Sequence, residues 1–216
     1  RALRCRVFGE GGNLGLTQRG RMEAAQAGVA LNTDFVDNSG GVDCSDHEVN
    51  IKLLLGEVVA AGDLTAKQRD LLLVSMTDAV AELVLANNRR QTQALSLVER
   101  HARSRLGEYL RFVGRMEAEQ DLDRSLEQLP SDDVLLERQR AGGGLTRPEL
   151  AVLLAWAKQY LKTRIVDTAV ATAPWAQPFA ASEFPETFAE RFRERIPEHF
   201  VYRNIVATQL ANDLVH

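Results

Sequence analysis

The stretch VFGEGGNLGLTQRGRMEAAQAGVALNTDFVDNSGGVDCSDHEVNIK, residues 7–52, is the densest run of glycine, asparagine and small polar residues in the chain. Val7 and Phe8 predict the end of a buried strand, and the glycines that follow permit torsions and close approaches that a side chain would block. Thr17 is expected to cap a helix over residues 18–27, because its hydroxyl can accept from a free amide of the first turn. Gly28 suits the left-handed position that ends such a helix.

The second half of the stretch repeats this order. Residues 29–35 predict a second strand, Asn38-Ser39-Gly40-Gly41 predicts a second glycine turn, and a further helix is expected to start near Asp46. Strand, glycine turn and helix, given twice, are typical of a nucleotide-binding sheet with small residues at the carboxyl ends of its strands. Asn13 and Asn38 can each donate and accept through one amide, which suits ribose hydroxyls and carboxamides.

A literal dinucleotide fingerprint is one interpretation of the first turn. It would use Gly9-x-Gly11, with Asp34 as the acid that binds the ribose about 20 residues further on. The spacing is imperfect, because the third glycine is Gly15 and Leu14 stands where the short form has glycine. A glycine-rich turn that packs a helix close to a strand is the plainer alternative.

Two motifs carry a family resemblance. Glu10-Gly11-Gly12-Asn13 and the segment DFVDNSGGVDCS, residues 34–45, resemble the last part of the nucleotide-binding domain of glutamate dehydrogenases. The usual forms there are Glu-Gly-Ala-Asn and Pro-Asp-x-x-x-Asn-Ala-Gly-Gly-Val-x-x-Ser. Gly12, Thr33 and Ser39 depart from these forms, and with the run 43–52 they resemble the large bacterial NAD-specific branch. Two later segments, 145–155 and 205–215, resemble the helical C-terminal region of that branch.

The resemblance implies a piece of an NAD-dependent glutamate dehydrogenase, which converts L-glutamate to 2-oxoglutarate and ammonia with hydride transfer to NAD. In that family the pyrophosphate turn lies upstream, so the literal fingerprint would misassign the roles. Asn13 would lie by the nicotinamide ribose, Asn38 near the nicotinamide, and Ser45 toward the side-chain carboxylate of glutamate. The implied cofactor-binding residues are Gly11, Gly12, Asn13, Asn38, Gly40 and Gly41, and the implied substrate-binding residues are Val42 and Ser45. The proton-transfer residues have no counterpart here, so this chain is expected to hold no catalytic residue and to be inactive alone.

Composition sets further bounds. The 216 residues are 45% hydrophobic, enough for one large domain or for a fragment plus a domain. A net charge of -4 argues against nucleic acid or an anionic membrane as the main partner. No apolar run approaches the roughly 18 residues that span a bilayer, and two cysteines suit a reducing cytoplasm. We expect a cytoplasmic enzyme, a homo-oligomer at full length.

A metal site is not expected. Cys44 and His47 have i, i+3 spacing at a predicted helix start, which would allow a reactive thiol or part of a metal site. Zinc needs more ligands at matching spacing, so a reduced, partly buried Cys44 is favoured.

Five arginines, at positions 89, 90, 100, 103 and 105, could bind phosphate. A solvated helix face, with pairing to Glu99 and Glu108, is the favoured interpretation.

The predicted fold class is mainly α, with a short α/β segment resembling part of a Rossmann fold before a helical domain. From residue 46 onward the pattern predicts helix and loop only. Residues 1–62 are assigned to the end of the NAD-binding domain and residues 63–216 to the helical domain, with a possible hinge at Gly142–Gly144. Helix starts are predicted from caps, and a short helix is expected at 123–129. The predicted capping residues are Thr65, Ser75, Ser104, Ser131 and Thr146, the last with Glu149 closing a capping box.

Two other functions compete with the enzyme. A stand-alone helical interaction or regulatory module would carry the α/β segment only incidentally. A complete small nucleotide binder using residues 9–15 would need a parallel sheet of several strands, which the helical remainder does not supply. Because a two-strand unit cannot form a stable open sheet alone, the N-terminal segment is expected to join other strands, which favours the enzyme.

Overall fold

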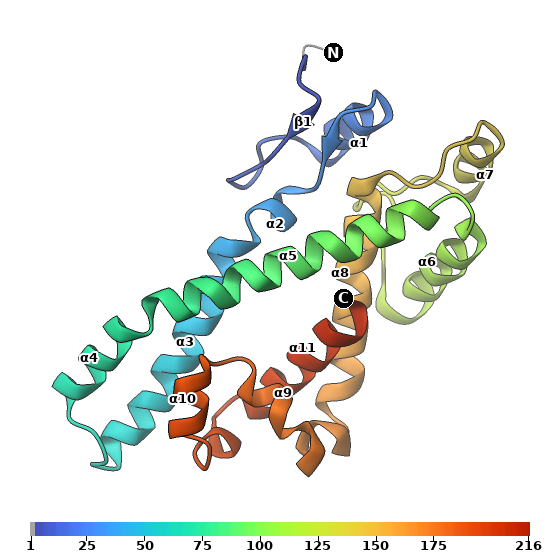
Figure 1. Ribbon diagram of the computed structural model, residues 1–216. Helices are drawn as coiled ribbons and strands as arrows, with labels where there is room; N and C mark the ends of the chain where they lie inside the picture. Colours follow the sequence, from blue (N-terminus) through green and yellow to red (C-terminus); the bar gives the residue numbers. More distant parts are fainter. Residues whose placement is uncertain (1–2) are drawn as a thin grey trace. The chain divides into compact units, whose positions relative to one another are not determined.

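The computed structural model describes residues 3–216 and is mainly helical (Figure 1). Its described strands are β1, Val7–Phe8, and β2, Ala30–Leu31, which pair in parallel with Val7 opposite Ala30 and Phe8 opposite Leu31. The predicted fold class, mainly α with a short α/β segment, is confirmed. Among the described residues, no helix combines the length and the apolar character that crossing a bilayer would require.

The chain divides into two compact units. The first comprises the chain up to Ser39 together with Arg90–Ala157, and the second comprises Gly40–Arg89 with Lys158–His216. Neither unit ends at residue 62, and the domain boundary assigned there stays a prediction. Two long helices, α5 (Thr77–His101) and α8 (Arg147–Val166), contribute residues to both units.

The first unit holds the parallel strands and the helices around them. Here α1 joins β1 to β2, so that the three form one βαβ unit (Figure 1). The remaining helices of this unit are short or of moderate length. Its elements besides the strands and the shared helices are α1 (Gln18–Gln26), α2 (Asp34–Asp37), α6 (Leu106–Gln120) and α7 (Asp132–Arg140).

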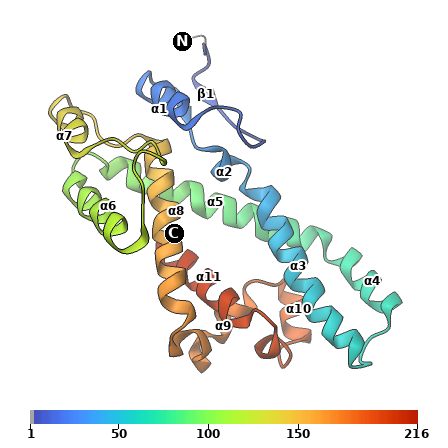
Figure 2. The ribbon, with the colours of Figure 1, turned by 180° about the vertical axis from the view of Figure 1, so that it is seen from behind.

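The second unit is built on α3 (Ser39–Ala60) and the C-terminal helices, as the view from behind shows (Figure 2). Leu54 and Leu55 of α3 are fully buried in one apolar core with Phe188 and Val206. Phe188 also stacks on Phe184, with 5.3 Å between the ring centroids. The other elements are α4 (Ala66–Ser75), η1 (Ala169–Thr172), η2 (Pro174–Ala176), α9 (Gln177–Ala181), α10 (Glu186–Arg191), η3 (Ile196–Glu198) and α11 (Tyr202–Val215).

Several predicted helix ends are confirmed. The hydroxyl of Thr17 accepts from the amide of Gly20 at 3.1 Å, and Thr65 forms a full capping box with Gln68. Ser131 caps α7 by accepting from the amide of Val134. After α1, Gly28 has a φ of 88°, which is the left-handed conformation that glycine adopts without steric cost.

The second strand is shorter than predicted. Only Ala30–Leu31 pair with β1, whereas the predicted strand continued to residue 35. Thr33 has extended torsions and Asp34 begins α2. The reason lies in Asp34, whose oxygens accept from the amides of Leu14 and Phe35. A side chain that bonds nearby backbone amides competes with strand pairing and favours a turn or a helix start.

The prediction of a second glycine turn was wrong, because its residues are helical. Ser39, Gly40 and Gly41 lie in the first turn of α3, so the helix begins seven residues before Asp46. The left-handed glycines among the described residues are elsewhere in the chain. Gly40 lies beside Val84, and a Cβ there would make an ordinary van der Waals contact of 3.5 Å with its Cγ1.

The predictions that Ser75 and Ser104 cap the helices after them were wrong. The hydroxyls of Ser75 and Ser104 donate to the carbonyls of Leu72 and His101, at 2.8 and 3.3 Å, so each serves the helix before it. Residues 123–129 form hydrogen-bonded turns rather than a helix, with Asp123 accepting from the next amides.

The glycines at 142–144 close one helix and pack against another. Gly142 has a φ of 92°, and the amide of Gly143 donates to the carbonyl of Arg138 at 2.8 Å, which completes the end of α7. A Cβ on Gly144 would lie 3.0 Å from backbone atoms of Ala102 and Arg103. Close approach is one physical reason for glycine here, and the hinge stays a prediction.

Candidate functional site

The first bend, between β1 and α1, is held by a buried ion pair. Arg21 of α1 donates from Nε to Oε2 of Glu10 at 2.6 Å and from Nη2 to Oε1 at 3.0 Å. Both side chains are almost completely buried. Glu10 Oε1 also accepts from the amide of Leu16 at 2.8 Å. Because paired, charge-assisted bonds fix geometry as well as adding energy, Glu10 anchors both ends of the bend.

Asp34, the first residue of α2, holds the same bend. Its Oδ2 lies 3.2 Å from Nη2 of Arg21 and accepts from the amide of Leu14 at 2.9 Å. Burial raises the pKa of Asp34, but the Leu14 amide, the Arg21 charge and the Phe35 amide together lower it below its ordinary value. The carboxylate is therefore ionised at neutral pH and engaged by protein donors, which argues against the ribose-binding role of the literal fingerprint.

The tip of the bend presents bare backbone. A Cβ on Gly11 or Gly12 would meet no atom within 4 Å, whereas a Cβ on Gly15 would lie 2.9 Å from Oε1 of Glu10. Leu14 has a φ of 62° and is 85% exposed. A left-handed, exposed leucine is unusual and costs backbone energy. The open glycines leave room for a flat group to approach the main chain.

The two asparagine-bearing segments meet. Nδ2 of Asn38 donates to Oδ1 of Asn13 at 3.0 Å, across 25 residues of sequence. The contact is exposed, and it uses one atom of each amide. The sequence predicted these two side chains at neighbouring strand tips, and the geometry places them in direct contact. Their roles in binding a cofactor stay predictions.

The other predicted site residues lie on α3 in the second unit. Gly40 and Gly41 occupy its first turn, followed by Val42, which is 61% exposed. Ser45 is exposed and its hydroxyl donates to the carbonyl of Gly41 at 3.3 Å. At i, i+3 spacing, Val42 and Ser45 share one face of the helix, so both side chains are open to solvent on the same side.

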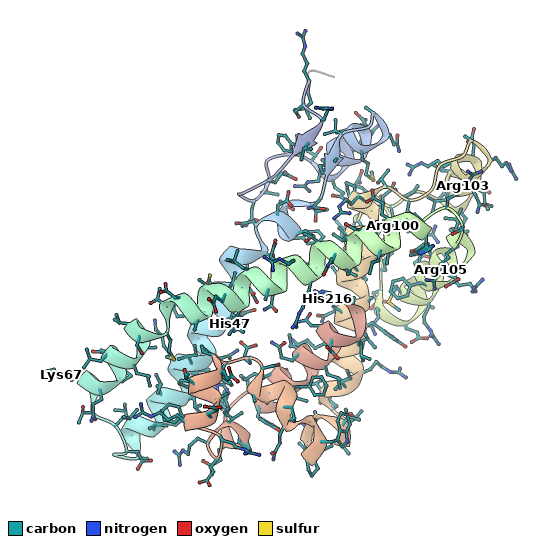
Figure 3. The ribbon with its side chains drawn as sticks, in the orientation of Figure 1. His47, Lys67, Arg100, Arg103, Arg105 and His216 are labelled. Carbon is teal, nitrogen blue, oxygen red and sulfur yellow. The ribbon has the colours of Figure 1, made fainter. Side chains whose placement is uncertain are left out.

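A buried polar cluster in the second unit was missed from sequence. His47, 1% exposed, places Nδ1 2.7 Å from the carbonyl oxygen of Glu183 and 3.2 Å from its Oε1. Oε1 and Oε2 of Glu183 also accept from Asn50 and Gln209. Nε2 of His47 lies 3.8 Å from Oδ2 of Asp43. Figure 3 shows His47 on α3, and only the i, i+4 pair of Asp43 and His47 is visible in the sequence.

Charges in this cluster shift one another. Burial lowers the pKa of His47, but the carboxylates of Glu183 and Asp43 raise it above its ordinary value. Burial raises the pKa of Glu183, and His47, Asn50 and Gln209 lower it overall. Burial lowers the pKa of Lys158 on α8 to about 8, against the attraction of Asp43. Both shifts favour the charged forms, with the His47 ring protonated and the Glu183 carboxylate ionised.

Cys44 is exposed, so the prediction of a partly buried cysteine was wrong. It stands three residues before His47 on α3, yet the imidazole is fully buried against Glu183 while the thiol faces solvent. A spacing of i, i+3 makes two side chains neighbours on a helix surface, but it does not give them the same burial. Here the Glu183 contact draws the imidazole inward.

Figure 3 labels three of the five arginines, Arg100, Arg103 and Arg105, near the end of α5. Arg105 forms an exposed ion pair with Glu108 at 2.5 Å, as predicted, and such pairs contribute little to stability. Glu99 does not join them, because its carboxylate pairs with Arg147 at 2.9 Å. That predicted pairing was wrong.

A cavity of about 400 Å³ lies in the first unit beside the paired strands. It is lined by strand residues and by Asn32, Asp37 and Arg147, and by none of the eight predicted site residues. The carboxyl ends of parallel strands are where open α/β sheets bind ligands. The described residues define a parallel βαβ segment of an α/β fold with a helical region after it.

Comparison with known proteins agrees with this class. The family model described as bacterial NAD-glutamate dehydrogenase, catalytic domain, matches residues 1–98, and the one described as glutamate dehydrogenase, C-terminal, matches residues 142–216. Proteins named NAD-specific glutamate dehydrogenase from Halomonas elongata and Pseudomonas aeruginosa are 58% and 56% identical over 100% of this chain. The one from Mycobacterium tuberculosis is 45% identical over 99%.

The chain belongs to the bacterial NAD-glutamate dehydrogenase family. It spans about 13% of the length of each of these relatives. The alignment therefore covers almost every residue described above but only a small part of each relative.

Proposed function

We propose that the polypeptide containing this chain oxidises L-glutamate with NAD, giving 2-oxoglutarate and ammonia, and that this chain supplies part of both binding sites. The observation that carries the proposal is the contact between Asn13 and Asn38, beside the open backbone of Gly11 and Gly12. The names of the relatives support NAD as the cofactor and glutamate as the substrate.

The first bend fits a nicotinamide nucleotide. NAD, when bound, supplies the redox chemistry by accepting a hydride. With Oδ1 of Asn13 bonded to Asn38, the Asn13 amide group retains donor capacity and the Asn38 oxygen retains acceptor capacity. These suit a ribose hydroxyl and a carboxamide respectively. Glu10, Arg21 and Asp34 do not touch the cofactor in this proposal, but they hold the bend in place.

The start of α3 fits the amino-acid substrate. Gly40 and Gly41 add backbone to the cofactor site, and Val42 and Ser45 face the glutamate. The Ser45 hydroxyl would exchange its bond to the Gly41 carbonyl for one to the side-chain carboxylate. First-turn amides of a helix have no intrahelical partner and attract negative charge, which adds to the case for an anionic substrate here.

Proton transfer is assigned to residues outside this chain. Two paired strands of two residues each do not make a stable open sheet, which supports the proposal that β1 and β2 join other strands of the full-length polypeptide. We further propose that the full-length enzyme is a cytoplasmic homo-oligomer.

The test is the reaction of the full-length polypeptide. Purified protein is supplied with L-glutamate and either NAD or NADP, and the reduced nucleotide is followed by absorbance while 2-oxoglutarate and ammonia are quantified. The proposal predicts one 2-oxoglutarate and one ammonia per NAD reduced, with NAD strongly preferred. Absence of nucleotide reduction with glutamate, under conditions where the protein is folded, would overturn it.

A further inference from the structure

Arg147, in the first turn of α8, binds two separate parts of the first unit. Its Nη1 donates to Oγ of Ser96 at 3.1 Å and pairs with Oε2 of Glu99 at 2.9 Å, and its Nη2 donates to the carbonyl of Thr92 at 3.0 Å. These three partners lie on α5. Its Nε donates to Oδ1 of Asn32, which directly follows β2.

Asn32 continues the connection toward the first bend. Its Nδ2 donates to Oδ1 of Asp37 at 2.6 Å, and Oδ2 of Asp37 accepts from the amide of Glu10 at 2.9 Å. Four residues therefore form one unbroken series of hydrogen bonds, Arg147 to Asn32 to Asp37 to Glu10. All four belong to the first unit. We call this series the Arg147 relay.

Both ends of the Asn32 amide are used, so its orientation is fixed. The oxygen faces the Arg147 guanidinium and the nitrogen faces the Asp37 carboxylate. The reverse orientation would place the amide oxygen against the Asp37 carboxylate and the amide nitrogen against the guanidinium, so both neighbours select the observed orientation. A guanidinium with a planar set of five donors suits this task, whereas an ammonium is a single point charge. The Arg147 side chain is only 16% exposed, which protects these bonds from water.

A second contact ties the same helix start to α1. Nε2 of Gln18 donates to the carbonyl of Pro148 at 3.3 Å, and Oε1 of Gln18 accepts from Nη1 of Arg21 at 3.3 Å. The bend is thus held from two sides: Arg21 binds the Glu10 carboxylate, and the Arg147 relay binds the Glu10 amide. Of these two supports, the relay acts on the Glu10 backbone amide through Asp37, whereas Arg21 acts on the Glu10 side chain.

We propose that Arg147 is a positioning residue for the cofactor bend: through Asn32 and Asp37 it fixes the backbone of Glu10 and hence of Gly11, Gly12 and Asn13. The inference rests on the proposed NAD site. It places a residue of the C-terminal family region, 142–216, in control of a bend in the catalytic-domain region, 1–98. A bend that is already ordered binds its ligand without the cost of ordering it on binding.

The test compares Arg147→Met with Arg140→Met in the full-length polypeptide. Arg140 is exposed at the end of α7 in the same unit, so it controls for loss of an arginine. NAD affinity is measured by titration, KM for NAD and for glutamate by initial rates, and amide exchange of residues 9–17 by mass spectrometry. For Arg147→Met we expect about a tenfold weaker NAD affinity, a matching rise in KM for NAD, and glutamate KM within about twofold. The bend should exchange faster, and Arg140→Met should match the parent.

Asn32→Ala guards against simple misfolding, because it cuts the relay while Arg147 keeps its α5 partners. It should weaken NAD affinity to the same extent, and the double variant should lose no more than either single one. Parent-like NAD affinity and exchange in both single variants would overturn the inference. So would equal rises in both KM values with unchanged exchange in the bend. If the parent itself binds no NAD, the proposed function fails, and the exchange of residues 9–17 still decides whether the relay holds the bend.

Discussion

Arg21 is the residue on which the first bend depends. It is 5% exposed and faces two carboxylates, Glu10 and Asp34, each of which also accepts a backbone amide from the bend. Removing one partner of such a buried group leaves a charge without compensation, which is strongly destabilising. This arrangement explains how a glycine-rich tip can be open to solvent and still have a fixed conformation.

Ser45→Ala tests the substrate role at the same scale. In the full-length polypeptide we expect KM for glutamate to rise, because the variant leaves a carboxylate without its donor, a loss of about 1–3 kcal/mol. The fold should not change, since the exposed hydroxyl bonds only the Gly41 carbonyl of its own helix in the described structure. Initial rates over a range of glutamate concentrations give the measurement.

Ser182→Ala is the matched control, because that exposed serine also donates to a carbonyl of its own helix turn, Phe179. Its glutamate KM should equal that of the parent. An unchanged KM in Ser45→Ala would remove Ser45 from the substrate site.

At the scale of elements, the helices whose caps are explicit could be predicted from sequence. Thr17, Thr65 and Ser131 each cap the helix expected of them. The errors fall where a polar side chain has two possible partners. Ser75 and Ser104 look like caps of the following helix but bond the preceding one, and local sequence does not distinguish these choices. The start of α3 was missed because Gly40 and Gly41 are weak helix formers, although both lie in its first turn.

Gly144 gives a prediction about element packing. Gly144→Ala would place a Cβ 3.0 Å from backbone atoms of Ala102 and Arg103, so the end of α5 or the start of α8 must shift. Such overpacking costs about 1–3 kcal/mol. Gly114→Ala in α6 is the control, because a Cβ there meets no atom within 4 Å and should stabilise the helix by about 0.5–1 kcal/mol. Chemical denaturation measures both, and equal stability of the two variants would contradict this account.

The pair of His47 and Glu183 predicts how stability depends on pH. Folding raises the pKa of His47 above 6.5, against the opposing effect of burial, because the carboxylates of Glu183 and Asp43 favour the charged ring. At a pH between the unfolded and the folded pKa of His47, the folded state therefore still binds a proton that the unfolded state has released. This stabilisation is complete below about pH 6.5 and is lost as pH rises through the folded pKa.

His47→Gln should remove this dependence. Thermal unfolding is measured for parent and variant between about pH 6 and 7, below the range where Lys158, with its pKa of about 8, would add an opposite trend. We expect the parent Tm to fall with rising pH in this window and the variant Tm to stay level. Equal slopes for the two proteins would show that His47 does not carry the linkage.

For the whole molecule, the sequence was sufficient for the fold class and for the proximity of Asn13 and Asn38, but not for the buried charges. Asn13 comes after β1 and Asn38 comes after β2 and α2, and the parallel pairing of the strands brings their carboxyl ends to one edge. The contact of His47 with Glu183 joins residues 136 apart in sequence, and no local pattern predicts it. The Arg147 relay likewise depends on tertiary packing.

The 216-residue chain alone is predicted to be inactive. Its proposed role is binding and orientation, and it spans about 13% of the length of its relatives. Purified chain mixed with NAD and L-glutamate should yield no reduced nucleotide above the enzyme-free rate, with full-length protein as the positive control. Turnover by the isolated chain would show that it holds proton-transfer groups that we have not assigned.

We propose above all that Asn13 and Asn38 form part of the NAD site. This proposal is tested most directly by titrating full-length parent, Asn13→Ala, Asn38→Ala and the double variant with NAD. We expect each single variant to bind NAD more weakly than the parent, by about 1–3 kcal/mol. The double variant should bind more weakly than either single variant, but by less than the sum of the two single losses, because the two amides are bonded to each other. NAD affinity equal to that of the parent in all three variants would contradict it.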